Sequence, residues 1–156
     1  MEALATIRTV SHVAIEVADL ATSVAFYRRT LGMTVIGDFS NDPAQPNVKA
    51  LLGDFAIEIA QSPEQADRSL AADTGHATPS LTLSLTVKDL RSAFARFRAS
   101  GLVDCAEPKT LGGAWFFTFR DPDGNAIELI EFPKDSSSLG ELLITHANRT
   151  SRGDQP

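Results

Sequence analysis

The chain has 156 residues, the length of one ordinary domain. Hydrophobic residues make up 43% of the sequence and charged residues 22%, which is typical of a globular protein and excludes a disordered tail or a fibrous repeat. A net charge of −6 argues against a nucleic acid or an anionic membrane as the main partner, because phosphate groups require a basic face. The single cysteine excludes an internal disulfide framework.

Two features favour a cytoplasmic protein without a membrane partner. No segment approaches the roughly 18–20 consecutive apolar residues that a membrane-spanning helix needs. The first residues, Met1–Ala5, lack the basic and apolar regions of a signal peptide.

The sequence contains an internal repeat with an offset of 70 residues. Ala56–Ile59 matches Ala126–Leu129, and Val17–Leu20 matches Val87–Leu90 at the same offset. Chance could explain one match of short apolar motifs, but it does not easily explain two at one offset. We therefore interpret the chain as two copies of one motif.

The first copy, residues 8–60, begins with an apolar, β-branched strand over Val13–Val17. Asp19 is expected to cap a helix with apolar residues at helical spacing, and Gly32 to end it. The further strands expected in this copy are Met33–Ile36, Val48–Leu52 and Phe55–Ala60, with a loop over Asp38–Asn47 before the second of them.

The second copy, residues 80–132, follows the same order. A strand over Leu81–Val87 precedes a helix that is capped by Asp89 and ends at Gly101. The remaining strands are expected at Leu102–Cys105, Trp115–Phe119 and Ala126–Phe132, with a proline- and glycine-containing turn over Asp121–Asn125.

Each copy is thus a βαβββ module, and the prediction is an α+β fold in a single domain over residues 8–132. A polar linker, residues 61–79, connects the modules. The tail, residues 133–156, is expected to form one short amphipathic helix followed by a disordered segment.

The alternation of side chains along the strands selects candidate functional residues. In the first strand, His12 and Glu16 share the face opposite the apolar residues, and Thr82 and Ser84 do the same in the second copy. In the last strand of each copy, Glu58 and Glu128 each lie between two apolar core residues, so we expect both to face a cleft.

If the two copies pack about a pseudo-two-fold axis, His12, Glu58 and Glu128 converge. A buried carboxylate is costly unless it is paired or metal-bound. One imidazole and two carboxylates favour a divalent ion such as Mn, Fe, Ni, Co, Mg or Zn. The two glutamates could instead transfer protons without a metal.

The sequence resembles the vicinal oxygen chelate superfamily, which includes glyoxalase I, bleomycin-resistance proteins, methylmalonyl-CoA epimerase and extradiol dioxygenases. The residues that carry the resemblance are His12–Leu20, Ser23–Tyr27, Leu31–Met33 and Asp121–Glu131. The resemblance implies a glyoxalase-like fold in which two tandem βαβββ modules form an open, cup-shaped eight-stranded sheet. It also implies a homodimer.

The resemblance further implies that His12, Glu58 and Glu128 are metal ligands, with Glu58 and Glu128 also catalytic. Family members of the glyoxalase type place a histidine where this chain has Thr82. A neutral hydroxyl is a poorer ligand than an imidazole, so this departure weakens metal binding. It speaks against a dioxygenase, which needs the second histidine, and also against glyoxalase I and the epimerase, which normally keep it.

The leading functional hypothesis is a metal-assisted lyase or isomerase that acts on a small oxygenated substrate. The alternatives are a metal-free protein that sequesters a drug or metabolite, as bleomycin-resistance proteins do, a dioxygenase-like member with a degenerate metal site, and a metal-free isomerase or cyclase. No organic cofactor is expected. Substrate contacts are expected from Glu16, Thr82, Ser84 and Trp115, although Trp115 could simply fill the core.

Overall fold

The structure is a computed structural model, and its contacts divide the chain into two units. The structure describes residues 9–64, 82–101, 105–134, 136 and 138–141. Unit 1 comprises residues 1–77 and 121–123, and unit 2 comprises residues 78–120 and 124–156.

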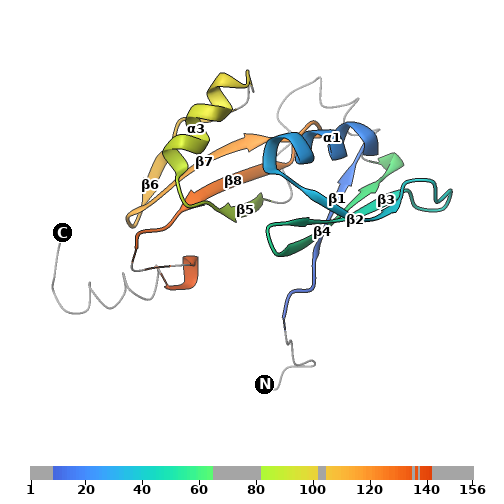
Figure 1. Cartoon of the computed structure of the whole chain (residues 1–156), viewed down its shortest axis with the longest axis horizontal. Helices are drawn as coiled ribbons and strands as arrows, with labels where there is room; N and C mark the ends of the chain where they lie inside the picture. Colours follow the sequence, from blue (N-terminus) through green and yellow to red (C-terminus); the bar gives the residue numbers. More distant parts are fainter. Residues whose placement is uncertain (1–8, 65–81, 102–104, 135, 137, 142–156) are drawn as a thin grey trace. The chain divides into compact units, whose positions relative to one another are not determined.

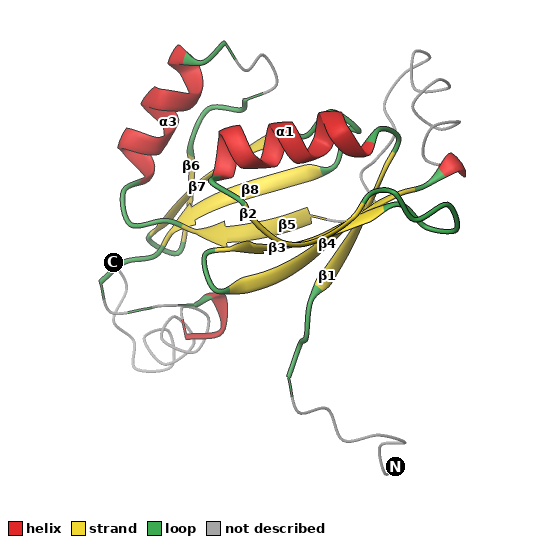
Figure 2. Cartoon of the chain, turned by 45° about the vertical axis from the view of Figure 1, so that its right-hand side comes forward, coloured by secondary structure: helices red, strands yellow, loops and turns green. Residues whose placement is uncertain are grey.

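Unit 1 contains a four-stranded sheet with the strand order β1-β4-β3-β2 (Figure 1). Its strands are β1 (Val13–Val17), β2 (Thr34–Phe39), β3 (Asn47–Leu52) and β4 (Phe55–Gln61). β1 runs parallel to β4, and the other pairs are antiparallel. The helix α1 (Leu20–Leu31) packs against β3 and β4 on one face of this sheet (Figure 2).

Unit 2 repeats this arrangement with the order β5-β8-β7-β6. Its elements are β5 (Thr82–Thr86), α3 (Leu90–Ala99), β6 (Lys109–Leu111), β7 (Ala114–Arg120) and β8 (Ala126–Glu131). Ala14 is opposite Glu58 in the first sheet, and Ser84 is opposite Glu128 in the second. The registers therefore agree at the offset of 70 residues, which confirms the repeat.

Both helices begin where the sequence predicts. The Asp19 carboxylate accepts a hydrogen bond from the Thr22 amide at 2.6 Å, and the Asp89 carboxylate accepts one from the Ser92 amide at 2.8 Å. The pKa of the Asp19 carboxyl is lowered chiefly by the Thr22 amide, and the pKa of the Asp89 carboxyl is lowered by the Ser92 hydroxyl, which donates to it at 2.6 Å, and then by the Ser92 amide. α1 ends at Gly32, which has the left-handed conformation (φ 69°) of a helix C-cap.

A second contact at each helix start also repeats, and the sequence analysis did not anticipate it. The Leu20 amide donates to Gln61 Oε1 at 3.4 Å, and the Leu90 amide donates to Glu131 Oε2 at 2.7 Å. Gln61 and Glu131 are the final residues of β4 and β8. In each unit, the last residue of the final strand thus accepts a hydrogen bond from a backbone amide at the start of the helix. Such an amide has no partner within the helix itself.

The core of each unit lies between the helix and the sheet. In unit 1 it includes Tyr27, Ile57 and Ile59, which are almost fully buried. In unit 2, Phe97 on α3 packs against Phe117 and Phe119 on β7, with ring centroids 5.4 and 4.6 Å apart. The burial of Ile57, Ile59, Ile127 and Leu129 confirms the core face that the sequence assigned to β4 and β8. A smaller cluster, Ala114 and Ile130 with Phe116 and Phe132, lies on the other face of the second sheet.

The sixth strand differs from the prediction. Residues 102–104 lie outside the described part of the chain, and Cys105 forms only an isolated bridge to Phe119. The edge strand of unit 2 is β6, which the sequence analysis missed. Gly112 and Gly113 join β6 to β7 in a two-residue turn, and both have positive φ. Glycine forms such a turn readily because it tolerates positive φ.

The bounds of several strands and helices also differ from the prediction. β2 continues to Phe39, beyond the predicted Ile36, and a bulge interrupts its pairing between Val35 and Gly37. α3 ends at Ala99, two residues before the expected Gly101. In the predicted tail helix, residues 139–141 are helical, whereas the predicted disordered segment and most of the linker lie outside the described residues.

No helix within the described residues is long and apolar enough to cross a membrane.

Candidate functional site

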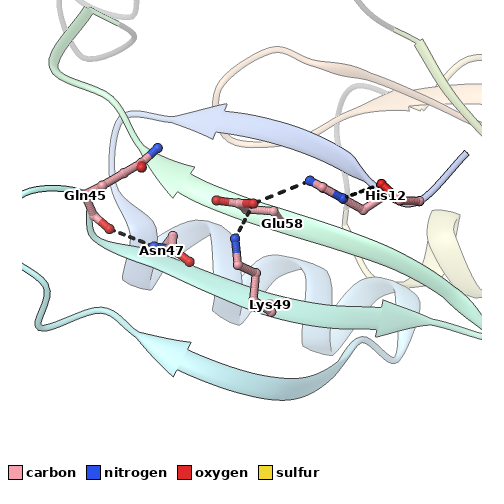
Figure 3. A network of polar contacts seen from close by, with 6 residues as sticks. His12, Gln45, Asn47, Lys49 and Glu58 are labelled. Carbon is pink, nitrogen blue, oxygen red and sulfur yellow. Dashed lines mark hydrogen bonds and ion pairs between the residues drawn. The ribbon is translucent and has the colours of Figure 1, made fainter. Parts of the chain in front are cut away.

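Glu58 is the best-defined functional candidate of unit 1. Its side chain is 13% exposed and lies on the sheet face opposite α1. Its Oε2 atom forms an ion pair with Lys49 Nζ and lies 3.7 Å from His12 Nε2 (Figure 3). His12 Nδ1 is hydrogen-bonded to the Ser11 hydroxyl at 2.9 Å. The structure therefore brings together His12 and Glu58, as the sequence predicted, and adds a lysine.

Strand pairing explains this cluster. Lys49 is directly opposite Glu58 in the antiparallel pair β3–β4. His12 comes just before β1, where Ala14 is opposite Glu58 in the parallel pair β1–β4. Sequence reasoning missed Lys49, although a signal was present: Lys49 lies between the buried Val48 and Ala50, just as Glu58 lies between two buried isoleucines.

Asn47 contributes a further polar group to the same face of β3, because residues two apart on a strand point the same way. Its side chain amide donates to the Gln45 carbonyl at 2.8 Å (Figure 3). Asn47 is only 8% exposed, and its Oδ1 atom is buried without a hydrogen-bond partner in the described part of the chain. A buried acceptor without a partner is costly, and a bound molecule with an O–H or N–H group would satisfy it only once the side chains that cover this atom move aside.

Glu128 is the corresponding carboxylate of unit 2. The Ser84 hydroxyl donates to Glu128 Oε1 at 2.7 Å, so these two residues lie on the same face of the second sheet. Thr82 precedes Ser84 on the same face of β5 and is exposed. In unit 1, Glu16 is exposed on β1.

Trp115 lies on the other face of its sheet. Its cross-strand neighbour is Glu131, whereas Glu128 is opposite Thr118. The Trp115 side chain is 46% exposed, and the guanidinium of Arg91 on α3 lies 6.0 Å from the centre of its ring. The structure therefore groups Trp115 with the helix and not with Ser84 and Glu128, because its strand parity is that of the core residues.

A second polar cluster lies beneath α1 in unit 1 and is structural. The buried Tyr27 hydroxyl donates to Asp121 Oδ2 at 2.8 Å. The Ser23 hydroxyl and the Ala18 amide donate to the two carboxylate oxygens of Asp123, at 3.0 and 2.7 Å. Burial, followed by the negative charge of Asp121, raises the pKa of Tyr27 far above its usual value.

Cys105 is not a candidate nucleophile. Burial is the main cause that raises the pKa of its thiol. A raised pKa reduces the fraction of reactive thiolate at neutral pH.

The predicted convergence of His12 and Glu58 with Glu128 joins residues of both units and stays a prediction. Among the residues that the structure describes, no three histidine, cysteine, aspartate or glutamate side chains gather into a group that could hold a metal ion.

The donors around Glu58 do not fit a divalent ion while Lys49 is in place. The oxygen that faces His12 is the same oxygen that Lys49 holds. Two unit charges of equal sign 4 Å apart repel by about 4 kcal/mol near a protein surface, and a divalent ion doubles the repulsion. The mismatch with a divalent ion is caused by Lys49 beside Glu58 and does not depend on the residue at position 82.

Comparison with known proteins identifies the family. Residues 9–129 match the model of the Glyoxalase/Bleomycin resistance protein/Dioxygenase superfamily, so the chain belongs to this superfamily. A lactoylglutathione lyase from Haemophilus influenzae is 31% identical over 136 residues, which cover 83% of this chain and 96% of that protein.

Solved structures show the same fold. A variant of the fosfomycin resistance protein FosX from Listeria monocytogenes, in complex with Mn(II) and 1S,2S-dihydroxypropylphosphonic acid, is similar with a TM-score of 0.68 and 16% identity, over 89% of this chain and 99% of that one. A glyoxylase/bleomycin resistance protein/dioxygenase domain from Frankia sp. EAN1pec is similar with a TM-score of 0.63 and 21% identity, over 84% and 96% of the chains. Together with the two βαβββ units, these similarities confirm the predicted glyoxalase-like α+β fold.

Proposed function

We propose that this chain is a lyase or isomerase of the glyoxalase type, and that it acts on a small oxygenated substrate bound at the face of the unit 1 sheet opposite α1. The observation that carries the proposal is Glu58, a carboxylate that is 13% exposed and is flanked by His12 and Lys49. The relationship to a lactoylglutathione lyase supports the reaction class.

The chemistry follows from these side chains. Glu58 accepts a proton from a carbon atom next to a substrate carbonyl, and the electron pair of the broken C–H bond moves toward the carbonyl oxygen. The Lys49 ammonium stabilises the negative charge that develops on this oxygen. When the carbon that loses the proton carries a hydroxyl group, return of the proton to the former carbonyl carbon completes an isomerisation, and the hydroxyl proton moves to the former carbonyl oxygen.

Asn47 and Glu128 have supporting roles in the proposal. The Asn47 amide oxygen, which has no hydrogen-bond partner among the described residues, accepts a hydrogen bond from a substrate hydroxyl once the side chains that cover it move aside. Glu128, held by Ser84, is proposed as a second proton-transfer group. Glu16 and Thr82 are proposed to contact the substrate from exposed strand positions.

The second candidate is a protein that sequesters a small molecule without chemistry. The observation that favours it is that both candidate carboxylates already have partners, Lys49 for Glu58 and Ser84 for Glu128. Carboxylates held in this way can bind a ligand through fixed polar groups and leave it unaltered.

Proton exchange distinguishes the two candidates. We would incubate the purified chain in D2O with a panel of small 2-hydroxy carbonyl compounds and glutathione thiohemiacetals, and follow deuterium incorporation and product formation by proton NMR. A lyase or isomerase exchanges the proton next to the carbonyl at a catalytic rate. A ligand that binds tightly while its protons stay unexchanged would contradict the enzymatic proposal and support sequestration.

The proposal also includes the expected assembly, a cytoplasmic homodimer. Sedimentation equilibrium of the purified chain measures the oligomeric state directly.

A further inference from the structure

Lys49 is the residue of the candidate site that neither the repeat nor the family resemblance predicts. Its Nζ atom forms an ion pair with Glu58 Oε2, the atom that also lies 3.7 Å from His12 Nε2. The position where the His12 imidazole and the Glu58 carboxylate could share a cation is therefore already next to the Lys49 ammonium (Figure 3).

The Lys49 ammonium can bind a ligand as well as neutralise the charge of Glu58. The Lys49 side chain is 42% exposed, so its end remains accessible from solvent. An ammonium has three N–H donors and no acceptor, and Glu58 is its ion-pair partner in the described part of the chain. The remaining donors can bind the oxygen of a ligand.

We propose that Lys49 is the resident cation of this site, in place of a divalent metal ion, and that its ammonium binds a negatively charged or strongly polarised oxygen of the substrate. The substrate role rests on the proposed function, whereas the exclusion of a metal ion does not. The ligand class is a small molecule with a carboxylate, phosphonate or enolisable carbonyl oxygen.

The neighbouring groups suit such a ligand. Asn47 lies two residues before Lys49 on β3 and has a buried amide oxygen that finds no partner in the part of the chain that the structure describes. A donor and an acceptor on the same strand face match a ligand that has an anionic oxygen beside a hydroxyl group. The Lys49 ammonium cannot be a metal ligand, because it has no lone pair and its positive charge repels a metal ion.

Metal titration of the full chain tests the proposal without a known substrate. The protein is purified without a histidine tag and stripped with a chelator, and Co2+ is added while heat and visible absorbance are recorded. The variant Lys49→Met removes the ammonium but keeps the length of the side chain. Lys88→Met is the matched control, because Lys88 is exposed on the loop before α3 in unit 2.

The expected result is weak Co2+ binding by the wild type and by Lys88→Met. Lys49→Met should bind Co2+ about tenfold more tightly or better, because the like charge beside Glu58 is gone. The added substitution Glu58→Gln should abolish this gain.

Two results would overturn the proposal: tight, stoichiometric Co2+ binding by the wild type, or equal affinity in the wild type and Lys49→Met. If circular dichroism shows that Lys49→Met does not fold, Lys49→Gln, which keeps a hydrogen-bond donor for Glu58, takes its place under the same criteria. Failure to find any turnover would count against the proposed function and would leave the outcome of the Co2+ titration unaffected.

Discussion

Tyr27 is the only tyrosine of the chain, and its hydroxyl is fully buried against Asp121. Burial and the neighbouring carboxylate raise its pKa far above the ordinary value of 10.0. In the unfolded chain the phenol ionises near that ordinary value. Above about pH 10 the unfolded state therefore releases a proton that the folded state keeps, and the free energy of unfolding falls as the pH rises.

The expected result is that tyrosinate absorbance appears only together with alkaline unfolding. Parallel measurements of tyrosinate absorbance and near-ultraviolet circular dichroism against pH check this. A tyrosinate signal with a midpoint near pH 10 in a chain that keeps its native dichroism would show that the buried hydrogen bond to Asp121 is absent.

Some residues of the candidate site could be predicted from the sequence, and one could not. The pattern of apolar neighbours identified Glu58 and Glu128 because a charged residue inside a buried strand is unusual. It did not identify Lys49, since the pairing of Lys49 with Glu58 depends on which residues of β3 and β4 are opposite one another. That register is a property of the folded sheet, and the loop between β2 and β3 gives no indication of it.

At the scale of secondary structure, Gly32 ends α1 in a left-handed conformation with φ of +69°. A Cβ atom at this position would meet no heavy atom within 4 Å, so a side chain is opposed only by the backbone conformation. We expect Gly32→Ala to lower the free energy of unfolding by about 1–2 kcal/mol, as measured by urea denaturation.

Gly32→Asn is the matched comparison, because asparagine tolerates the left-handed region better than alanine does. It should cost less than Gly32→Ala. Equal losses for the two variants would mean that sterics, rather than backbone conformation, determine the cost.

The elements themselves were largely predictable from local signals. Asp19 and Asp89 predict where the two helices begin, and the alternation of apolar residues predicts which face of the long strands is buried. β6 was missed because it has three residues, and all of them are exposed. The pair Gly112–Gly113 was the available signal, since two adjacent glycines are typical of a tight hairpin turn.

At the scale of the whole molecule, unit 1 is not one continuous stretch of chain, because it includes residues 121–123 of the turn between β7 and β8. Residues 121–123 make their contacts with unit 1, although the strands on either side belong to unit 2. Asp123 accepts hydrogen bonds from the Ala18 amide and the Ser23 hydroxyl, and Ser23 is completely buried. The same turn belongs to the motif that carried the family resemblance, and its structural role explains why its residue types are specific.

We expect Asp123→Ala to lower the free energy of unfolding by about 2–4 kcal/mol, because two donors lose a charged acceptor. Urea denaturation followed by circular dichroism measures the change. Glu107→Ala is the control: Glu107 is an exposed partner of Arg98, and its loss should cost less than about 1 kcal/mol. Similar costs for the two substitutions would show that the turn does not anchor unit 1.

The chain as a whole is proposed to act through Glu58, and the most direct measurement is proton exchange by the variant Glu58→Gln. Once the D2O assay identifies a substrate, kcat is compared for the wild type, Glu58→Gln and the exposed control Glu107→Gln. The amide of glutamine cannot accept the proton, so we predict that kcat falls by about 10²–10⁴-fold in Glu58→Gln and stays unchanged in Glu107→Gln. Wild-type exchange rates in Glu58→Gln would contradict the assignment of Glu58 as the proton-transfer group.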